Sequence, residues 1–238
     1  MITKSKYNWK QLGGTVTISG KEARQNSGAN QIINLLKAKV DQLEKTMAQT
    51  LGAGMFLTTG TDSNTIIQSI PTIVASGTYT VGGLAHATYS WWQSQTGTAA
   101  SFAANGLAEM RNIFNDCSLQ DQSDTPNIII TTQAVYEYYE GVLQPQERFQ
   151  DKTTADGGFQ NLLFKGVPLT WDSYCTASKM YFLNTKYLDL YVHKDADMKF
   201  GEFQEPENQD AKVAKCIWMG ELTSSNVQKQ GVMTVTAA

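Results

Sequence analysis

The chain has few residues with which to build a catalytic or metal centre. Its 238 residues include three cysteines and two histidines. Cys117, Cys175 and Cys216 are odd in number and show no CxxC spacing, so neither a disulfide framework nor a zinc site is expected. Histidine is the side chain type whose ordinary pKa lies nearest to neutral pH, but no partner lies at a recognisable motif spacing from His86 or His193. We therefore expect a protein that is not an enzyme and uses no cofactor and no metal.

Net charge and long apolar runs are also scarce. The 19 basic and 22 acidic residues give a formal net charge of -3, which provides no basic field for holding nucleic acid. Any contact with DNA should be weak and unspecific. No apolar run approaches the roughly 20 residues that span a bilayer, and the N-terminus lacks the features of a signal peptide. We expect no association with a membrane and synthesis in a reducing cytosol.

The first 27 residues alternate between polar and apolar side chains. Gly13-Gly14 lies in the middle of this segment, and the pattern predicts a two-stranded hairpin with a glycine-rich bend. Such a hairpin buries too little apolar surface to be stable alone, so it must lie on its own chain or on a neighbouring one. Its apolar residues are Tyr7, Trp9, Leu12, Val16 and Ile18.

A helical period follows over residues 27–51. Gly52 and Gly54 mark its expected C-terminal end, and the helix would be roughly 30 Å long. One apolar stripe along that length fits a helix laid on a sheet or on a neighbouring molecule, or an ordinary amphipathic surface helix. The stripe consists of Ile32, Leu36, Val40, Leu43, Met47 and Leu51.

The remaining sequence predicts an α+β fold in which the strands gather late in the chain. Residues 53–97 read as irregular, with short β-like runs at 69–74 and 78–81. Thr131 or Thr132 is placed to cap the third helix, and Asn184-Thr-Lys is expected to join two strands as a hairpin. Further helices are expected at 98–119 and 133–143, and strands at 127–131, 159–172, 180–192, 212–222 and 231–236.

Three other features admit a chemical interpretation. A hydrolase could pair Cys117 or Cys175 with a histidine, although no nucleophile motif supports this. The acidic residues between 195 and 207 could collect a hard cation, but they lack EF-hand spacing and fit a solvated loop better. The adjacent Trp91 and Trp92 could line a sugar or a partner, or fill the space under a loop.

The order of these elements resembles the major capsid proteins of tailed bacteriophages, whose fold is shared with encapsulins and the herpesvirus capsid floor. The resemblance rests on the N-terminal extended segment, the long helix and Ile-Ile-Ile-Thr-Thr at 128–132. It continues through Phe-Lys-Gly-Val-Pro-Leu-Thr-Trp-Asp at 164–172 and Tyr-Phe-Leu-Asn-Thr-Lys-Tyr-Leu-Asp-Leu at 181–190. Family members usually have an N-terminal arm before the extended loop. Met1 lies almost at that loop, so the chain is either a short member or lacks its N-terminal segment.

The resemblance implies an extended loop at 1–27, a peripheral domain with the spine helix at 28–57, an axial domain at 58–190, and returning peripheral strands at 191–238. It implies a virion shell protein, made in the host cytoplasm, that forms pentamers and hexamers and then an icosahedral shell around double-stranded DNA. Scaffolding and portal proteins are further expected partners. The residues expected at contacts between subunits are Tyr7, Trp9, Leu12, Val16, Ile18, Leu36 and Leu43.

Two alternatives remain open at this point. An encapsulin-like compartment shell would have the same fold and enclose protein cargo. A carbohydrate-binding virion module would use Trp91 and Trp92, and it would be a trimer or a monomer.

Overall fold

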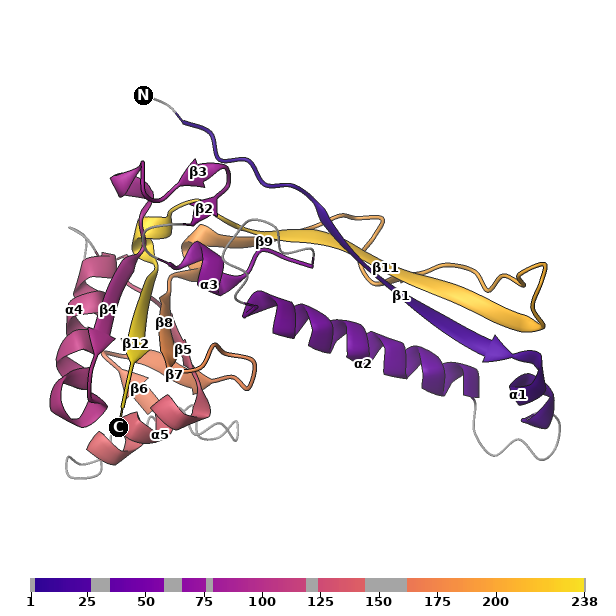
Figure 1. The fold of residues 1–238 in the computed structure, drawn as a ribbon, viewed down its shortest axis with the longest axis horizontal. Helices are drawn as coiled ribbons and strands as arrows, with labels where there is room; N and C mark the ends of the chain where they lie inside the picture. Colours follow the sequence, from indigo (N-terminus) through magenta and orange to yellow (C-terminus); the bar gives the residue numbers. More distant parts are fainter. Residues whose placement is uncertain are drawn as a thin grey trace.

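The computed structural model describes residues 3–26, 35–57, 66–75, 79–118, 124–143 and 162–237. These residues form an elongated molecule with a four-stranded sheet in one half and a six-stranded sheet in the other (Figure 1). Helices and strands occur in both halves, which confirms the predicted α+β class. Ile32 of the predicted helix stripe lies outside the described residues.

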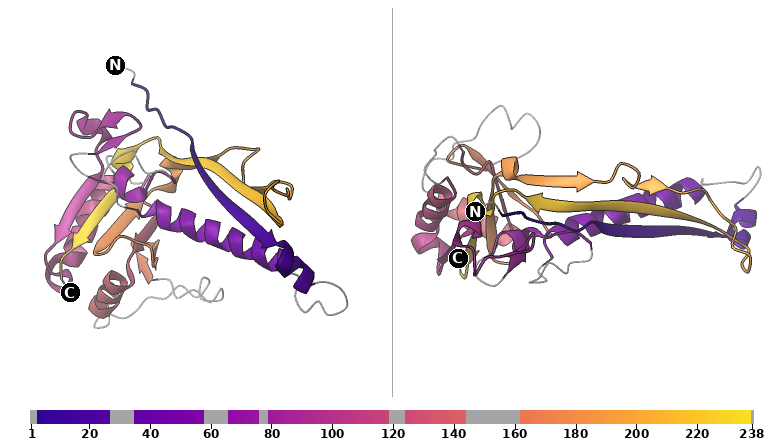
Figure 2. Two further views of the ribbon diagram at one scale, coloured as in Figure 1. Left: turned by 45° about the vertical axis from the view of Figure 1, so that its right-hand side comes forward. Right: turned by 90° about the horizontal axis from the view of Figure 1, so that it is seen from above.

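The elongated half consists of the four-stranded sheet and a long helix on one of its faces. Its longest strand, β11, pairs with β1 along one edge and with β9 and β10 along the other, always antiparallel. Figure 2 shows this half projecting away from the six-stranded sheet. Its elements are β1 (Lys10–Ser19), α1 (Gly20–Gln25), α2 (Leu35–Met55), β9 (Leu188–Val192), β10 (Lys199–Phe200) and β11 (Ala211–Ser224).

The predicted N-terminal hairpin is wrong. Residues 10–19 form the single strand β1, and its partner is β11 of the same chain. Gly13 and Gly14 lie within the strand and make no turn. A Cβ on Gly14 would lie 2.6 Å from Leu43 Cδ1 and 3.3 Å from Met47 Sδ, so this glycine permits the close approach of α2.

The long helix α2 is confirmed, but its predicted C-terminal end is wrong. It continues through Gly52 and Gly54 to Met55. A Cβ on Gly54 would lie 3.1 Å from Ile66 Cγ2 and 3.2 Å from Ile67 Cγ2. The glycine therefore serves packing between segments rather than helix termination.

The compact half consists of the six-stranded sheet with helices on one face. The strand order is β4-β12-β8-β5-β7-β6, in which β12 is parallel to β4 and β5 is parallel to β7. Helix α4 packs on β4 and β12, and α5 packs near β7 (Figure 1). The elements are β4 (Gln95–Ala99), α4 (Leu107–Ser118), β5 (Ile128–Thr131), α5 (Gln133–Leu143), β6 (Leu162–Phe164), β7 (Val167–Trp171), β8 (Lys179–Leu183) and β12 (Gly231–Val235).

Several predicted elements are confirmed and two need correction. The strand at 127–131 and the helix at 133–143 are present as β5 and α5. The β-like run at 69–74 is instead the short helix α3 (Ile70–Ile73), with Pro71 in its first turn. The helix predicted at 98–119 starts later than expected, because residues 95–99 form the strand β4. A π-helical turn, Phe102–Gly106, follows and leads directly into α4.

Thr131, one of the two predicted caps of α5, lies within a strand, and the short turns lie next to strands. Thr131 Oγ1 donates to the carbonyl of Lys179 on β8, so Thr131 does not cap α5. The turn between β6 and β7 is formed by Lys165 and Gly166, both with positive φ, and Val167 already begins β7. The shorter elements are β2 (Thr80–Val81), β3 (Leu84–Ala85) and the 3₁₀ turns Ser90–Trp92, Thr185–Tyr187 and Val227–Lys229.

The chain crosses between the two sheets. The Asn184 connection is not a hairpin, because β8 lies in the six-stranded sheet and β9 pairs with β11 in the four-stranded sheet. The last strand, β12, returns to the six-stranded sheet between β4 and β8. The predicted range 191–238 therefore combines strands of both sheets, and β12 belongs with the strands assigned to 58–190.

Two buried hydrophobic clusters hold these layers together. One lies between the six-stranded sheet and helices α4 and α5, and includes Met110, Ile129 and Met233. The other joins α2 and β11 to the opposite face of the six-stranded sheet, where the rings of Phe56 and Tyr181 lie 6.2 Å apart. Among the helices in the described ranges, none combines the length and apolar character needed to cross a bilayer.

Candidate intersubunit surface

The outer edge of β1 presents unpaired backbone groups. β1 ends the strand order, and among the described strands only β11 pairs with it. Two contacts identify the residues that face outward. The Thr17 carbonyl accepts from Lys39 Nζ, and the Ser19 N–H donates to Glu22 Oε2, so neither group points to β11. Because both backbone groups of a residue lie on one side of an antiparallel strand, Thr15 and Gly13 also face the open edge.

An open edge of this length is a template for another strand. Unpaired N–H and C=O groups in a row favour pairing with a further chain unless they are covered or charged. At one end, α1 begins directly after Ser19, whose side chain and backbone form a capping box with Glu22. The Thr17 carbonyl is covered by Lys39 Nζ. No partner for the outward backbone groups of Thr15 and Gly13 is found among the described residues, so this middle part of β1 is available for pairing.

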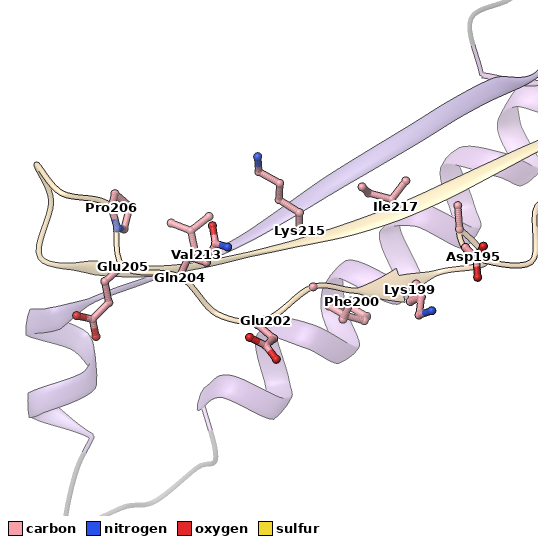
Figure 3. Close-up of a pocket in the computed structure, with 12 residues that line it drawn as sticks. Asp195, Lys199, Phe200, Glu202, Gln204, Glu205, Pro206, Val213, Lys215 and Ile217 are labelled. Carbon is pink, nitrogen blue, oxygen red and sulfur yellow. The ribbon is translucent and has the colours of Figure 1, made fainter.

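The face of the four-stranded sheet opposite α2 carries a groove of about 680 Å³ (Figure 3). Its floor is formed by Val213, Lys215 and Ile217 of β11, which point away from α2 in the figure. One wall is the segment around Lys199 and Glu202. The residues of the floor alternate along β11 with buried residues on the α2 side, because successive residues of a strand face opposite sides of the sheet. The groove therefore offers apolar surface bordered by charges of both signs.

Four of the residues predicted at subunit contacts pack within their own chain. Val16 and Ile18 are buried on the face of β1 that α2 covers. Leu12 and Leu43 are half-buried against the same hydrophobic cluster. The alternation in the sequence thus predicts a strand with one buried face, and α2 of the same chain, rather than another subunit, covers that face.

The other three residues are more accessible. Tyr7 is half-buried, and its hydroxyl donates to the carbonyl of Ser224 at 2.9 Å. Trp9 is 52% exposed and meets the ring of His193 edge-on at 5.8 Å between centroids. Leu36 is 43% exposed near the start of α2. A role between subunits remains a prediction for all seven, and Trp9 and Leu36 present the most apolar surface for it.

Other exposed apolar residues were not predicted from the sequence, and four of them lie on or beside strands. Leu190 and Tyr191 lie on β9, and Trp171 and Tyr174 lie at and beyond the end of β7. Both strands read as apolar runs, and a run at the margin of a sheet has the same composition as a buried one. No signal in the sequence separates the two cases.

The three cysteines and His86 are buried side chains. Cys117, Cys175 and Cys216 are all buried, as predicted for Cys117. Burial raises the pKa of the Cys175 thiol to about 12 and raises the pKa of Cys117 as well, so neither is a ready thiolate. His86 is buried, with Nδ1 2.9 Å from the carbonyl of Ala75. Within the described ranges no group of His, Cys, Asp and Glu could hold a metal ion.

The adjacent tryptophans divide between two roles. Trp92 is buried, and its indole N–H donates to the carbonyl of Val81 at 3.2 Å. Trp91 is 48% exposed, with its ring 5.6 Å from that of Tyr89. Trp92 therefore fills the space under a loop, and Trp91 alone is open to a ligand or partner.

Sequence comparisons identify no relative: no family model matches the chain, and no curated protein matches it. Solved structures do match over nearly the whole chain. The capsid of cyanophage A-1(L) is 16% identical, with a TM-score of 0.62 over 95% of this chain and 77% of that one. The SrpI encapsulin of Synechococcus elongatus PCC 7942 is 9% identical, with a TM-score of 0.67 over 96% and 74%.

A third match is the capsid of Myoviridae phage XM1, which is 11% identical with a TM-score of 0.62 over 96% of this chain and 74% of that one. The chain has the fold of phage capsid proteins and encapsulins. The predicted resemblance is confirmed at the level of the fold. The open edge of β1 and the groove beside β11 both lie in the half that projects from the six-stranded sheet.

Proposed function

We propose that this chain is a non-enzymatic shell subunit, the major capsid protein of a tailed bacteriophage. It assembles into pentamers and hexamers, and these close into an icosahedral shell around double-stranded DNA. The observation that carries the proposal is the agreement of fold with phage capsid proteins over nearly all of the chain. In this proposal the protein is made in the host cytoplasm and resides in the virion.

The two halves take different parts in the proposed shell. The six-stranded sheet, within residues 58–190 and extended by β12, is the axial domain that gathers around the five- and six-fold axes. The four-stranded sheet and α2 are the peripheral domain, and residues 1–27 are the extended segment that meets a neighbour. The open edge of β1 supports this assignment, because identical chains that contact one another through unlike surfaces can close into rings.

Charge and exposed apolar side chains support two of the proposed partners, DNA and a neighbouring copy of the chain, and the family resemblance implies the others. A formal net charge of -3 suits a wall that encloses DNA without binding it tightly. Trp9 and Leu36 are the candidate apolar contacts with the next subunit. Scaffolding and portal proteins complete the proposed set of partners.

An encapsulin-like compartment is the second candidate, favoured by the similarity to the SrpI encapsulin. The two candidates share their fold and differ in contents. A carbohydrate-binding virion module is the third, and the exposed ring of Trp91 is the feature that favours it.

Electron microscopy of the purified protein, with its mass in solution, tests assembly. Closed particles or rings of five and six support a shell, and nuclease-protected DNA inside particles from infected or induced cells distinguishes a capsid from a compartment with protein cargo. A uniform monomer or trimer under assembly conditions contradicts the proposal and favours the carbohydrate-binding module. Sugar-dependent quenching of tryptophan fluorescence that Trp91→Ser abolishes would then support that module.

Thr15→Pro tests the open edge of β1. The outward N–H of Thr15 is lost while the pairing of β1 with β11 is retained, because proline is tolerated on an edge strand where its nitrogen faces outward. We expect a folded chain that forms fewer particles. Thr15→Val is the matched control, since it keeps the N–H and a β-branched side chain. Normal assembly of the proline variant would exclude strand pairing at this edge.

The helix stripe supplies a second pair of variants. Leu36→Asp changes an exposed residue and should reduce assembly while leaving the chain folded. Leu43→Asp places a charge against the hydrophobic cluster and should destabilise the chain itself. Wild-type assembly of Leu36→Asp would remove this residue from the interface.

A further inference from the structure

A polar cavity opens on the face of the six-stranded sheet that α4 does not cover. Gly97 of β4 faces α4, since a Cβ there would lie 2.8 Å from Ile113 Cδ1. Successive residues of a strand point to opposite faces, so Thr96 and Thr98 project from the other side. Both line a cavity of about 410 Å³.

Three strands align hydrogen-bond donors in a row across this cavity. Thr234 of β12 pairs with Thr98 of parallel β4 and with Lys179 of antiparallel β8. Directly paired residues on neighbouring strands present their side chains on the same face, about 5 Å apart. Lys179 Nζ donates to Thr234 Oγ1 at 2.6 Å. The row therefore holds two hydroxyls and one ammonium side by side.

A second set of hydroxyls borders this row. Tyr181, two residues from Lys179 on β8, lines the cavity together with Tyr79 and Thr176. A tyrosine phenol is protonated at neutral pH and can donate a hydrogen bond, and burial raises the pKa of Tyr181 further. Apolar surface from Pro71 and Val74 forms part of the wall. The cavity is thus polar on the sheet side, bordered by α3 and the residue that follows it, and open to solvent at Thr96 and Thr98.

Among the described residues that line the cavity, Lys179 carries a positive charge and none carries a negative charge. Within the described residues, no carboxylate lies within ion-pair distance of Lys179, and no acidic residue lines the cavity. Threonine hydroxyls solvate an ammonium group but do not neutralise it. A half-buried cation among hydroxyl donors is a complementary environment for an oxyanion.

We propose that this cavity binds a phosphate group, with Lys179, Thr234 and Thr98 as its primary ligands. Lysine binds phosphate as a point charge, and threonine and tyrosine hydroxyls commonly contact phosphate oxygens. The volume exceeds that of one phosphate, so the group can carry a substituent. Free phosphate, a nucleotide and the DNA backbone all present this chemistry. The cavity has this chemistry whether or not the chain is a shell subunit.

Calorimetric titration of the purified chain with inorganic phosphate tests the site. The titration is run at constant ionic strength with chloride as the reference anion, and repeated with deoxyadenosine monophosphate, a short single-stranded oligodeoxynucleotide, and acetate. We expect saturable phosphate binding with one site per chain. Tighter binding of the nucleotide or the oligonucleotide identifies the source of the phosphate group. Preference for acetate over phosphate would overturn the proposal in favour of a carboxylate ligand.

Lys179→Met keeps the length of the side chain and removes its charge, and it should weaken phosphate binding by at least about tenfold. Thr234→Val is nearly isosteric and should weaken binding severalfold while the strand is retained. Lys199→Met removes an exposed charge from the other sheet and should leave binding unchanged. Thermal unfolding establishes that each variant is folded. Absence of saturable binding in the wild type, or equal binding by Lys179→Met, overturns the proposal.

Discussion

A buried ion pair joins β1, β11 and the segment that leads into α3, and breaking it should destabilise the chain markedly. Lys10 Nζ lies 3.2 Å from Glu221 Oε2, and the two side chains are 11% and 5% exposed. Lys10 also donates to Gln68 Oε1 at 3.3 Å, while Glu221 accepts from the N–H groups of Gln68 and Leu222. The pair is therefore almost removed from solvent and has its own hydrogen-bonded surroundings.

Lys10→Met leaves the carboxylate of Glu221 buried without its cation. Removing one partner of a buried pair costs about 3–5 kcal/mol. We expect the lower value, about 3 kcal/mol, because two backbone N–H groups still donate to Glu221. Adding Glu221→Gln to Lys10→Met removes the uncompensated charge and should recover much of that loss. Urea unfolding of the unassembled chain at pH 7.5 measures each free energy.

The effect of pH has a definite sign. Burial raises the pKa of Glu221, against the opposing effects of the Gln68 N–H and Lys10. A carboxyl with a raised folded-state pKa stabilises the protein most when it is protonated, and this stability is lost as pH rises from the ordinary glutamate pKa through the raised one. Without Lys10 the pKa rises further, so the penalty of Lys10→Met should be larger at pH 7.5 than at pH 5.

A matched control separates burial from loss of charge. Lys212 forms an ion pair with Glu205 at 3.4 Å, but the two side chains are 60% and 71% exposed. Lys212→Met should change stability by no more than about 0.5 kcal/mol. An equally mild effect of Lys10→Met, or a double variant no more stable than Lys10→Met, would show that an uncompensated buried charge is not what destabilises the chain.

Three further predictions concern packing and buried groups. Gly97→Ala places a Cβ 2.8 Å from Ile113 Cδ1 and should cost about 1–3 kcal/mol in urea unfolding, unlike Gly141→Ala, where nothing lies within 4 Å. Cys117 and Cys175, buried and with raised pKa values, should react with a thiol reagent at pH 8 only at the rate of unfolding, and fast labelling of the native chain would contradict their burial. Lys229 Nζ donates to the carbonyl of Ser118 at 2.7 Å and lies 3.7 Å from Asp124 Oδ2, so Lys229→Met should lower the melting temperature by several degrees, and an unchanged value would show that these contacts are dispensable.

Local sequence patterns correctly predicted the helices and strands whose formation depends on neighbouring residues. Helix α5 has the predicted bounds of 133–143, and the strand before it differs from the prediction by one residue. The spacing of Leu43 and Met47 correctly predicts the face of α2 that packs inward. The order of such elements along the chain was also sufficient to suggest the capsid fold.

Long-range pairing could not be read in the same way. β1 pairs with β11, about 200 residues further along the chain, and no local feature specifies that partner. If the partner strand is assumed to be adjacent in the sequence, Gly13-Gly14 predicts a bend. In the structure, Gly14 instead allows α2 to pack closely on β1. For the same reason the alternation of Val16 and Ile18 identified a buried face but not the element that covers it. The open edge of β1 becomes apparent only when the strand order is known.

The junction between the two halves connects stability to the proposed assembly. α2 extends over 21 residues, or roughly 30 Å, from that junction, so a rotation of about 5° there moves its far end by roughly 3 Å. Contacts between closely packed surfaces do not tolerate such a displacement without repacking. The ion pair of Lys10 and Glu221 and the rings of Phe56 and Tyr181 lie where the halves meet.

If the chain is a shell subunit, loosening this junction should broaden the distribution of particle sizes before it prevents assembly. Lys10→Met, studied at a temperature where the isolated chain remains folded, should give particles of more variable diameter than the wild type or Lys212→Met. Electron micrographs of the three preparations measure that spread directly. Uniform particles from Lys10→Met would show that contacts with neighbouring subunits, rather than this buried pair, set the angle between the two halves.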